Sequence, residues 1–438
     1  MLRSLTIKNV GPAPELNLEL GERLNIITGD NGLGKSFLLD IAWWALTRRW
    51  PAELNPNLTS GYMARPKPGA EASINFAFTG KVQKTESYES TFNHAEQAWT
   101  GPAGRPSNPG LVLYAQVDGS FAVWDPARNG WKKQGNIDVQ ERQPAYVFSP
   151  KQVWDGLQGE KGEWLCNGLI RDWASWQREN SSNFGLLKTI IKALSPSNEL
   201  IGIGYLTRVS ISDVRDIPTL KMPNGEEVPV IYASAGVRRI IALAYLLVWV
   251  WKEHMLACSL LGINVSNQVI FLVDEIETHL HPSWQRSVLI PLFIVVTTII
   301  EGLYISHSKS AQVQVITTTH SPLVMASVES KFDSSLDAWF DLDLVTNGEK
   351  SKIELTRRIW QRHGDVSNWL MSEAFDLKSG RSLDAEQTLE EASNAMVNPQ
   401  FGKAEAQALH KKLAGVLGDT DPFWINWRYV AEKKGWLE

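Results

Sequence analysis

The feature that most constrains this chain is the segment GDNGLGKS at residues 29–36. It fits the pattern G-x-x-x-x-G-K-[S/T] without a mismatch, with Gly29, Gly34, Lys35 and Ser36 at the fixed positions. A run with the pattern of a strand precedes the segment, and a run with the pattern of an amphipathic helix follows it. This order predicts a phosphate-binding loop between a strand and a helix, rather than a chance glycine-rich turn.

The chemistry of phosphate binding explains this composition. Backbone N–H groups must converge on the phosphate oxygens, and glycines leave that approach open because they carry no side chain. The following helix directs its positive N-terminal end at the anion, while Lys35 neutralises the β- and γ-phosphates and Ser36 holds Mg²⁺. The residues expected to contact the nucleotide are Gly29, Asp30, Asn31, Gly32, Gly34, Lys35, Ser36 and Phe37.

Periodicity along the chain predicts an α/β fold. Apolar residues alternate in the first strands, whereas two later runs, QVIFLV and VQVITT, are apolar on both faces, which is typical of a central parallel sheet. Strands are expected at 2–10, 14–20, 24–28, 268–273 and 313–318, and helices at 36–50 and 237–257. The fold class is therefore expected to be a central, mostly parallel sheet with helices, an antiparallel β subdomain and a helical C-terminal tail.

Changes in composition suggest four regions. Glycine, proline and short alternating runs become frequent after residue 50, and helical periodicity returns near residue 146. The expected organisation is a core of 1–50 and 200–350, an antiparallel β subdomain at 51–145, a helical subdomain at 146–200 and a helical region at 351–438.

Composition limits the cellular setting. The chain has 438 residues, with 43 Lys and Arg against 48 Asp and Glu, so its net charge of -5 does not favour broad nucleic-acid binding. Two cysteines without a C-x-x-C pair fit a reducing cytoplasm. The apolar runs at 240–251 and 287–300 are shorter than the ~20 residues of a spanning helix, so we expect no membrane segment.

A second candidate site residue pair follows the strand at 268–273. The sequence IFLVDEIETHLHP places Asp274 and Glu275 at the carboxyl end of this strand, the edge at which parallel sheets bind nucleotides. We expect Asp274 to bind Mg²⁺ through water and Glu275 to activate the attacking water as general base. His279 and His281 are two residues apart with no third ligand nearby, so a metal site there is not expected.

Two further segments complete the pattern. In TTTHSPL, His320 follows the strand at 313–318, where an imidazole can hydrogen-bond the γ-phosphate and sense hydrolysis. In YASAGVRR, Ser234 and Gly236 lie at the start of a long helix, a turn that leaves N–H groups free for an anion. The residues alone fit equally well an ordinary helix cap followed by two solvated arginines.

Taken in order, these segments resemble the ABC-type ATPase heads of the structural-maintenance-of-chromosomes and RecF-like group. They are most similar to stand-alone bacterial anti-phage defence ATPases of the Septu and retron-associated type. The carrying segments are LRSLTIKNVGP, ITGDNGLGKSFLLD, SAGVRR, VIFLVDEIETHLHP and TTTHSPLV. The resemblance implies a P-loop ABC-type head with ATP and Mg²⁺, and two heads that enclose two ATP molecules.

The resemblance also assigns roles. Ser234 and Gly236 would contact the γ-phosphate bound by the partner, Glu275 would be the catalytic base, and His320 the switch histidine. A glutamine after a strand of the middle region should bind the metal with Ser36 and Asp274, and Gln152 in YVFSPKQVW is the candidate. The signature reads SAGVR rather than SGGQ, and no heptad-bearing insert is present, so the long coiled-coil arm is absent.

The resemblance implies a partner as well as a reaction. Asp341 and Asp343 resemble a nuclease D-x-D motif, but they follow His320 too closely for a separate domain and fit a strand of the ATPase sheet. We therefore expect an ATP-hydrolysing switch that forms a homodimer or a higher homo-oligomer and controls an effector nuclease or toxin encoded nearby. A RecF-like DNA-repair ATPase and an assembly scaffold with negligible turnover are the alternatives, and a nucleic-acid partner stays open.

Overall fold

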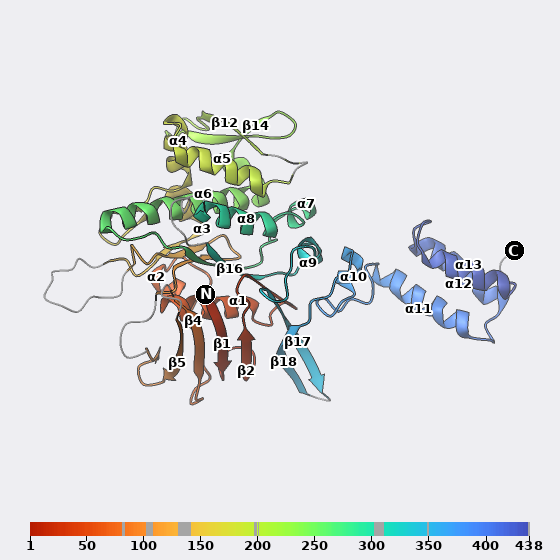
Figure 1. Ribbon diagram of the computed structural model, residues 1–438. Helices are drawn as coiled ribbons and strands as arrows, with labels where there is room; N and C mark the ends of the chain where they lie inside the picture. The colour runs from red at the N-terminus through yellow and green to blue at the C-terminus, as the bar shows by residue number, and fades with distance from the viewer. Residues whose placement is uncertain are drawn as a thin grey trace. The chain divides into compact units, whose positions relative to one another are not determined.

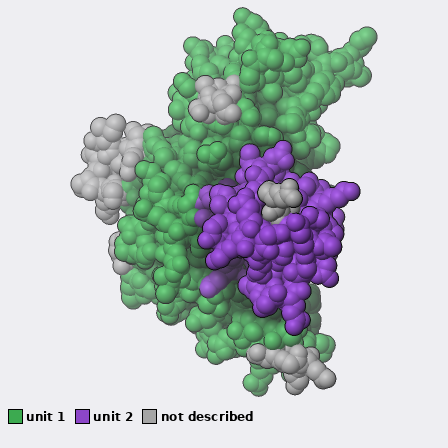
Figure 2. Space-filling model, turned by 90° about the vertical axis from the view of Figure 1, so that its right-hand side faces the viewer, with its two compact units in different colours: residues 1–364 green, residues 365–438 purple. Residues whose placement is uncertain are grey.

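The computed structural model describes residues 1–80, 84–101, 108–129, 142–196, 199, 201–301, 311–347 and 350–436. The chain forms two compact units, residues 1–364 and residues 365–438 (Figure 2). The first unit holds every residue expected to form the site. The second unit is helical and is described separately below.

An eight-stranded sheet forms the centre of the first unit, in the order β18-β17-β3-β16-β15-β7-β8-β9. The five inner strands, from β17 to β7, are parallel, and antiparallel strands extend both edges. The expected parallel sheet is thus confirmed. The strands are β3 (Leu24–Gly29), β7 (Leu111–Ala115), β8 (Phe121–Trp124), β9 (Tyr146–Phe148), β15 (Gln268–Val273), β16 (Gln312–Thr318), β17 (Ala338–Asn347) and β18 (Lys350–Arg358).

A second, antiparallel sheet lies beside the first, with helix α1 (Lys35–Thr47) between them (Figure 1). Its strands are β1 (Leu2–Lys8), β2 (Glu15–Glu19), β4 (Ser73–Thr79), β5 (Thr85–Asn93) and β6 (Ala98–Trp99). Helix α1 contacts β1 on one side and β3, β7, β15 and β16 on the other. Because α1 is enclosed on both sides, most of its residues are buried, including Trp43 and Trp44. The phosphate loop therefore enters a rigid part of the core.

Helices α6 (Ala235–Leu261) and α8 (Leu289–Glu301) cover the opposite face of the large sheet (Figure 1). Leu247 and Val250 of α6 approach Leu111 and Val269 of the sheet around a small apolar cavity. At 27 residues α6 is longer than its apolar run suggested, and length and composition alone would suit a membrane span. However, 67% of its most apolar window is buried within the protein, as in a core helix.

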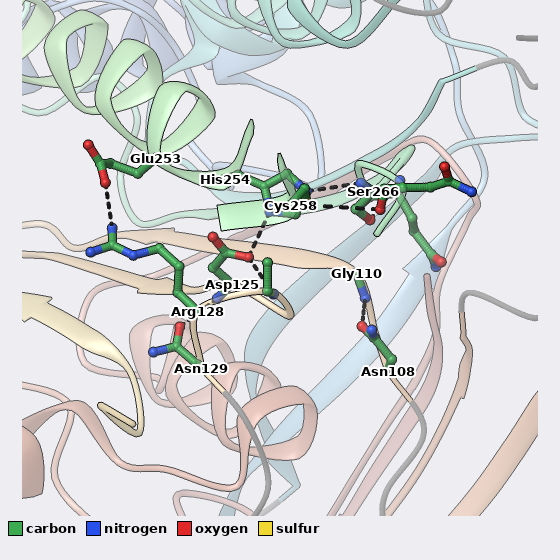
Figure 3. Close-up of polar contacts among 12 residues, drawn as sticks. Asn108, Gly110, Asp125, Arg128, Asn129, Glu253, His254, Cys258 and Ser266 are labelled. Carbon is green, nitrogen blue, oxygen red and sulfur yellow. Dashed lines mark hydrogen bonds and ion pairs between the residues drawn. The ribbon is translucent and has the colours of Figure 1, made fainter. Parts of the chain in front are cut away.

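The C-terminal half of α6 is fixed by a buried histidine (Figure 3). His254 is 1% exposed, and its Nδ1 lies 2.7 Å from Oδ1 of Asp125, just after β8. Its Nε2 accepts a hydrogen bond from the Ser266 amide at 2.9 Å, so the proton resides on Nδ1 and is donated to Asp125. Nearby, Arg128 pairs with Glu253. These contacts bind α6 to the end of β8 and to the chain that enters β15.

The remaining elements depart in part from the expected regions. Residues 51–145 do not form a separate β subdomain, because β4–β6 join β1 and β2 whereas β7 and β8 join the large sheet. The region 351–438 begins with a strand, β18, rather than a helix. Connecting elements are α2 (Pro51–Leu54), α3 (Pro150–Asp155), β10 (Leu157–Gln158), β11 (Trp164–Cys166), α4 (Leu169–Arg178), α5 (Ser182–Leu194), β12 (Gly202–Thr207), β13 (Ile217–Lys221), β14 (Glu227–Pro229), η1 (Val230–Tyr232), α7 (Pro282–Gln285) and α9 (Pro322–Val328).

The second unit is built from helices with its own apolar core. Its elements are α10 (Val366–Leu370), α11 (Leu383–Val397), α12 (Lys403–Val416) and α13 (Phe423–Lys433). Trp427 is fully buried among leucine and alanine side chains of α11 and α12. The expected helical character of the C-terminal region is therefore present from residue 365 onward.

Candidate functional site

The segment 29–34 forms a turn between β3 and α1, as its sequence predicts. Gly29 and Gly34 both have a positive φ, of 128° and 103°, a conformation that other residues rarely adopt. A side chain on Gly29 would also meet the carbonyl of Leu342 at 2.2 Å. Asp30, Asn31 and Gly32 form the exposed part of the turn. The loop therefore presents backbone rather than side chains at the N-terminus of a 13-residue helix.

Lys35 is held against this loop. Its Nζ donates hydrogen bonds to the carbonyls of Gly29 at 2.7 Å and Asp30 at 2.8 Å, and the residue is 5% exposed. Burial lowers the pKa of Lys35, and the carboxylates of Glu275 and Asp274 oppose that shift. These carboxylates favour the charged form of Lys35, the form that can pair with a phosphate. Phe37, in the first turn of α1, packs beside Gly11.

Asp274 lies at the carboxyl end of β15 and is 2% exposed. Its Oδ1 accepts a hydrogen bond from the Thr318 hydroxyl at 2.7 Å, at the end of the neighbouring strand β16. Burial raises the pKa of Asp274, while Thr318 and Ser36 lower it. Asp274 therefore lies beside Ser36, as expected for two residues that share one magnesium ion.

Glu275 adopts an unusual backbone conformation. Its φ of 43° lies in the left-handed region, which is costly for a residue with a side chain. The Glu275 amide donates to the Thr318 hydroxyl at 2.7 Å, and its Oε2 accepts from the Thr278 hydroxyl at 3.0 Å. This turn separates the side chains of the acidic pair: Asp274 is buried, whereas Glu275 is half-exposed.

His320 lies close to Glu275, although 45 positions separate the two in the sequence. Its Nε2 is 3.5 Å from Oε1 of Glu275. Burial lowers the pKa of His320, and the positive charge of Lys35 lowers it further. The structure thus brings together the lysine, the acidic pair and the histidine that the sequence identified separately.

Gln152 does not lie at this site. It belongs to the first turn of α3, where its Oε1 accepts hydrogen bonds from the Ser149 amide and from Asn55. It follows β9, which β7 and β8 separate from β15, a distance of about 14 Å across three strand spacings. The sequence alone gave no indication of that order, because β9 and β7 have similar apolar patterns.

Gln116 is the glutamine at the correct edge of the sheet. It directly follows β7, whose neighbour β15 ends at Asp274, and the Asp274 amide donates to the Ala115 carbonyl at 2.9 Å. Gln116 is 2% exposed, and among the described residues neither atom of its amide has a hydrogen bond of normal geometry, although the amide lies close enough to Asp40 and Tyr114 to lower the pKa of both. A buried amide of this kind is costly unless a ligand completes it. The signal for it was LVLYAQV, a parallel strand ending in glutamine.

The signature turn has two parts. Ser234 caps α6 by accepting from the Val237 amide, and it is exposed with Ala235 and Arg238. Gly236 is buried instead, and it lies so close to the His279 carbonyl that an added Cβ would be 2.5 Å from that oxygen. Within one chain, therefore, only the exposed residues of the turn are accessible to a ligand.

Arg239 is largely buried, so the interpretation of this helix as a cap followed by two solvated arginines is wrong for this residue. Its Nη1 donates to the Val117 carbonyl at 2.5 Å, and its Nη2 donates to the carbonyls of Asp274 at 2.9 Å and Glu275 at 3.2 Å. The signature helix is thus bound directly to the turn after β7 and to the acidic pair. Sequence patterns missed this residue because backbone carbonyls leave no signal of their own.

One other expectation has a definite outcome, and His281 caps α7. Asp341 and Asp343 lie on β17, which pairs parallel with β3, so the strand interpretation is confirmed. Both accept hydrogen bonds from Arg358.

The sequence comparisons identify a family and several relatives. Residues 24–326 match the family described as "AAA domain, putative AbiEii toxin, Type IV TA system", and the chain belongs to this AAA domain family. The chain is 26% identical over 218 residues to the Retron Ec83 probable ATPase of Escherichia coli, which covers 49% of this chain and 34% of that protein. It is 20% identical over 331 residues to the Septu protein PtuA of Bacillus thuringiensis, covering 74% and 72%. The chain thus spans about a third of the retron relative.

Two solved structures are also similar, at low levels. The SMC head bound to the C-winged helix domain of ScpA has 13% identity and a TM-score of 0.40, covering 81% of this chain and 98% of that one. The recombination mediator RecF with ATPγS has 13% identity and a TM-score of 0.36, covering 82% and 98%. The family match and the strand order together define the chain as an α/β protein of this AAA domain family, with a P-loop between β3 and α1.

Proposed function

We propose that this chain binds ATP with Mg²⁺, hydrolyses it, and uses the ATP-bound state as a switch in anti-phage defence. One observation carries the proposal: adjacent ends of the parallel strands β3, β16, β15 and β7 present Lys35, His320, Asp274 and Gln116 at one edge. This edge of a parallel sheet is where nucleotides bind. The similarity to retron and Septu proteins supports the role in defence.

Each residue has a distinct task in this proposal. The amides of residues 29–34 and Lys35 hold the phosphates, and Lys35 exchanges its two carbonyl partners for phosphate oxygens. Ser36, Asp274 and Gln116 would hold Mg²⁺, which neutralises charge on the β- and γ-phosphates. The buried amide of Gln116, which has no hydrogen bond of normal geometry among the described residues, fits this task.

Hydrolysis would depend on Glu275 and His320. Glu275 is half-exposed at the edge of the sheet and takes the proton of the attacking water as general base. His320, 3.5 Å away, donates a hydrogen bond to the γ-phosphate. Glu275 would thus contact the attacking water, and His320 would contact the phosphate that the water attacks.

A second copy of the chain would complete the site. Ser234 and Ala235 are exposed at the N-terminus of the 27-residue helix α6, where N–H groups favour an anion. We propose that they contact the γ-phosphate bound by the partner, so that two heads close over two ATP molecules. The closed dimer would then control an effector, a nuclease or toxin, in the cytoplasm.

The test compares two variants with the natural protein. Glu275→Gln should lower the rate of ATP hydrolysis roughly 10²- to 10⁴-fold, because the general base is lost, and should accumulate an ATP-bound dimer. Lys35→Ala should remove ATP binding in calorimetry and leave the protein monomeric by light scattering. The scaffold alternative would be favoured if the natural protein hydrolyses no ATP above background and the Glu275→Gln variant has the same rate. Hydrolysis stimulated by DNA in a salt-sensitive manner would favour the repair alternative.

A further inference from the structure

Glu277 is a buried carboxylate that the proposed reaction does not use. It lies two residues after Glu275 and is 9% exposed. Its Oε1 accepts a hydrogen bond from the His320 amide at 2.5 Å, and its Oε2 accepts from the Thr319 hydroxyl at 2.8 Å. Both carboxylate oxygens thus contact the segment that carries the candidate switch histidine.

Burying a carboxylate costs free energy that a neutral side chain would avoid. Burial accordingly raises the pKa of Glu277, and the hydrogen bond from the His320 amide opposes this shift. Two donors converge on this one position, and a carboxylate supplies an acceptor for each, whereas an amide supplies only one. In return for this cost, one rigid carboxylate fixes the positions of both donors, the His320 amide and the Thr319 hydroxyl.

The same contacts fix the backbone on both sides of His320. Thr319, held by Glu277, uses its Oγ1 to accept from the Ser321 amide at 3.0 Å. Ser321 in turn caps α9. With the amide of His320 and the amide that follows it both bound, only the side-chain torsions of the imidazole stay free. Its Nε2 then lies 3.5 Å from Glu275.

We propose that Glu277 is a positioning residue that aims His320 at Glu275 and at the γ-phosphate. The inference rests on the proposed ATPase function and deepens it, because it identifies what couples the loop after β15 to the loop after β16. Glu277 itself contacts neither water nor nucleotide in this scheme. Its removal should lower the rate of hydrolysis and leave ATP affinity nearly unchanged.

A double-mutant cycle tests the coupling. Glu277→Ala should lower kcat roughly 10- to 100-fold, as expected for a misplaced catalytic group, with KM for ATP changed less than about threefold. Glu277→Gln, which keeps an acceptor for the His320 amide, should retain more activity than Glu277→Ala. In a His320→Ala background, Glu277→Ala should lower kcat less than about twofold further. Glu160→Ala, at an exposed glutamate of the same unit, is the matched control.

The outcomes separate the inference from the proposed function. If Glu277→Ala lowers kcat by the same factor with and without His320, the two residues act independently and the inference is overturned. If circular dichroism shows that Glu277→Ala does not fold, the cycle is run with Glu277→Gln. The inference is then overturned if Glu277→Gln lowers kcat by the same factor with and without His320. If the natural protein hydrolyses no ATP, the proposed function fails instead.

Discussion

Asp40 provides a test of the site that does not depend on catalysis. It lies on α1 one turn after Ser36, and its Oδ1 accepts a hydrogen bond from the Tyr114 hydroxyl at 2.9 Å. Burial raises the pKa of Asp40 from 3.8 to about 7, and the hydrogen bond from Tyr114 opposes this shift. The folded protein therefore holds this proton more tightly than the unfolded chain does.

The sign of the pH dependence follows from that difference. The contribution of Asp40 to the free energy of unfolding is fully present below pH 3.8 and is lost as the pH rises to about 7. At about 1.4 kcal/mol per pH unit, the interval corresponds to roughly 4 kcal/mol. Because Asp40 keeps some contact with solvent, we take roughly 3 kcal/mol as the expected magnitude.

Asp40→Asn should remove this cost while keeping an acceptor for Tyr114. The variant should exceed the natural protein in free energy of unfolding by about 3 kcal/mol at pH 8, and by only about 1 kcal/mol at pH 5. Urea unfolding at both pH values, followed by tryptophan fluorescence, measures the difference, with Glu160→Gln as an exposed control. An equal gain at both pH values, or a loss of stability at pH 8, would refute the reasoning.

Two further predictions concern the contacts around the acidic pair. Arg239→Lys keeps the charge but cannot bind three carbonyls at once, so it should lower kcat roughly tenfold and the free energy of unfolding by about 1–3 kcal/mol; unchanged hydrolysis would show that the contact is passive. Gln116→Ala should shift the activation of hydrolysis to higher Mg²⁺ concentration, whereas Gln152→Ala should change stability alone. The same Mg²⁺ titration of both variants decides between the two glutamines.

Strong local patterns made much of the fold predictable. The strand expected at 268–273 is β15 itself, and the loop, its strand and its helix lie where GDNGLGKS indicated. A strand is apolar on both faces when other elements cover both faces of its sheet, so such a run indicates a central strand. The acidic pair and His320 were predictable for the same reason, because each directly follows such a strand.

The pairing of distant strands was not predictable in this way. β7 lies parallel to β15 although more than 150 positions separate them, and its short apolar sequence LVLYA does not indicate which strands it pairs with. The sequence therefore predicts one subdomain at 51–145, and it points to Gln152 instead of Gln116. The three carbonyls bound by Arg239 could not be predicted either, because every residue has a backbone carbonyl and the sequence does not mark which of them bind a side chain.

The signature turn shows why a motif and its function must be separated. Gly236 is required within one chain, because the carbonyl of His279 leaves no room for a side chain there. A glycine at this position therefore says nothing by itself about a second subunit. Ser234 is different: capping α6 needs only a hydroxyl or carboxylate, yet the residue is also exposed at the helix N-terminus. If the turn acts in trans, the information for that role resides in Ser234 and in the exposed amides beside it, not in the glycine.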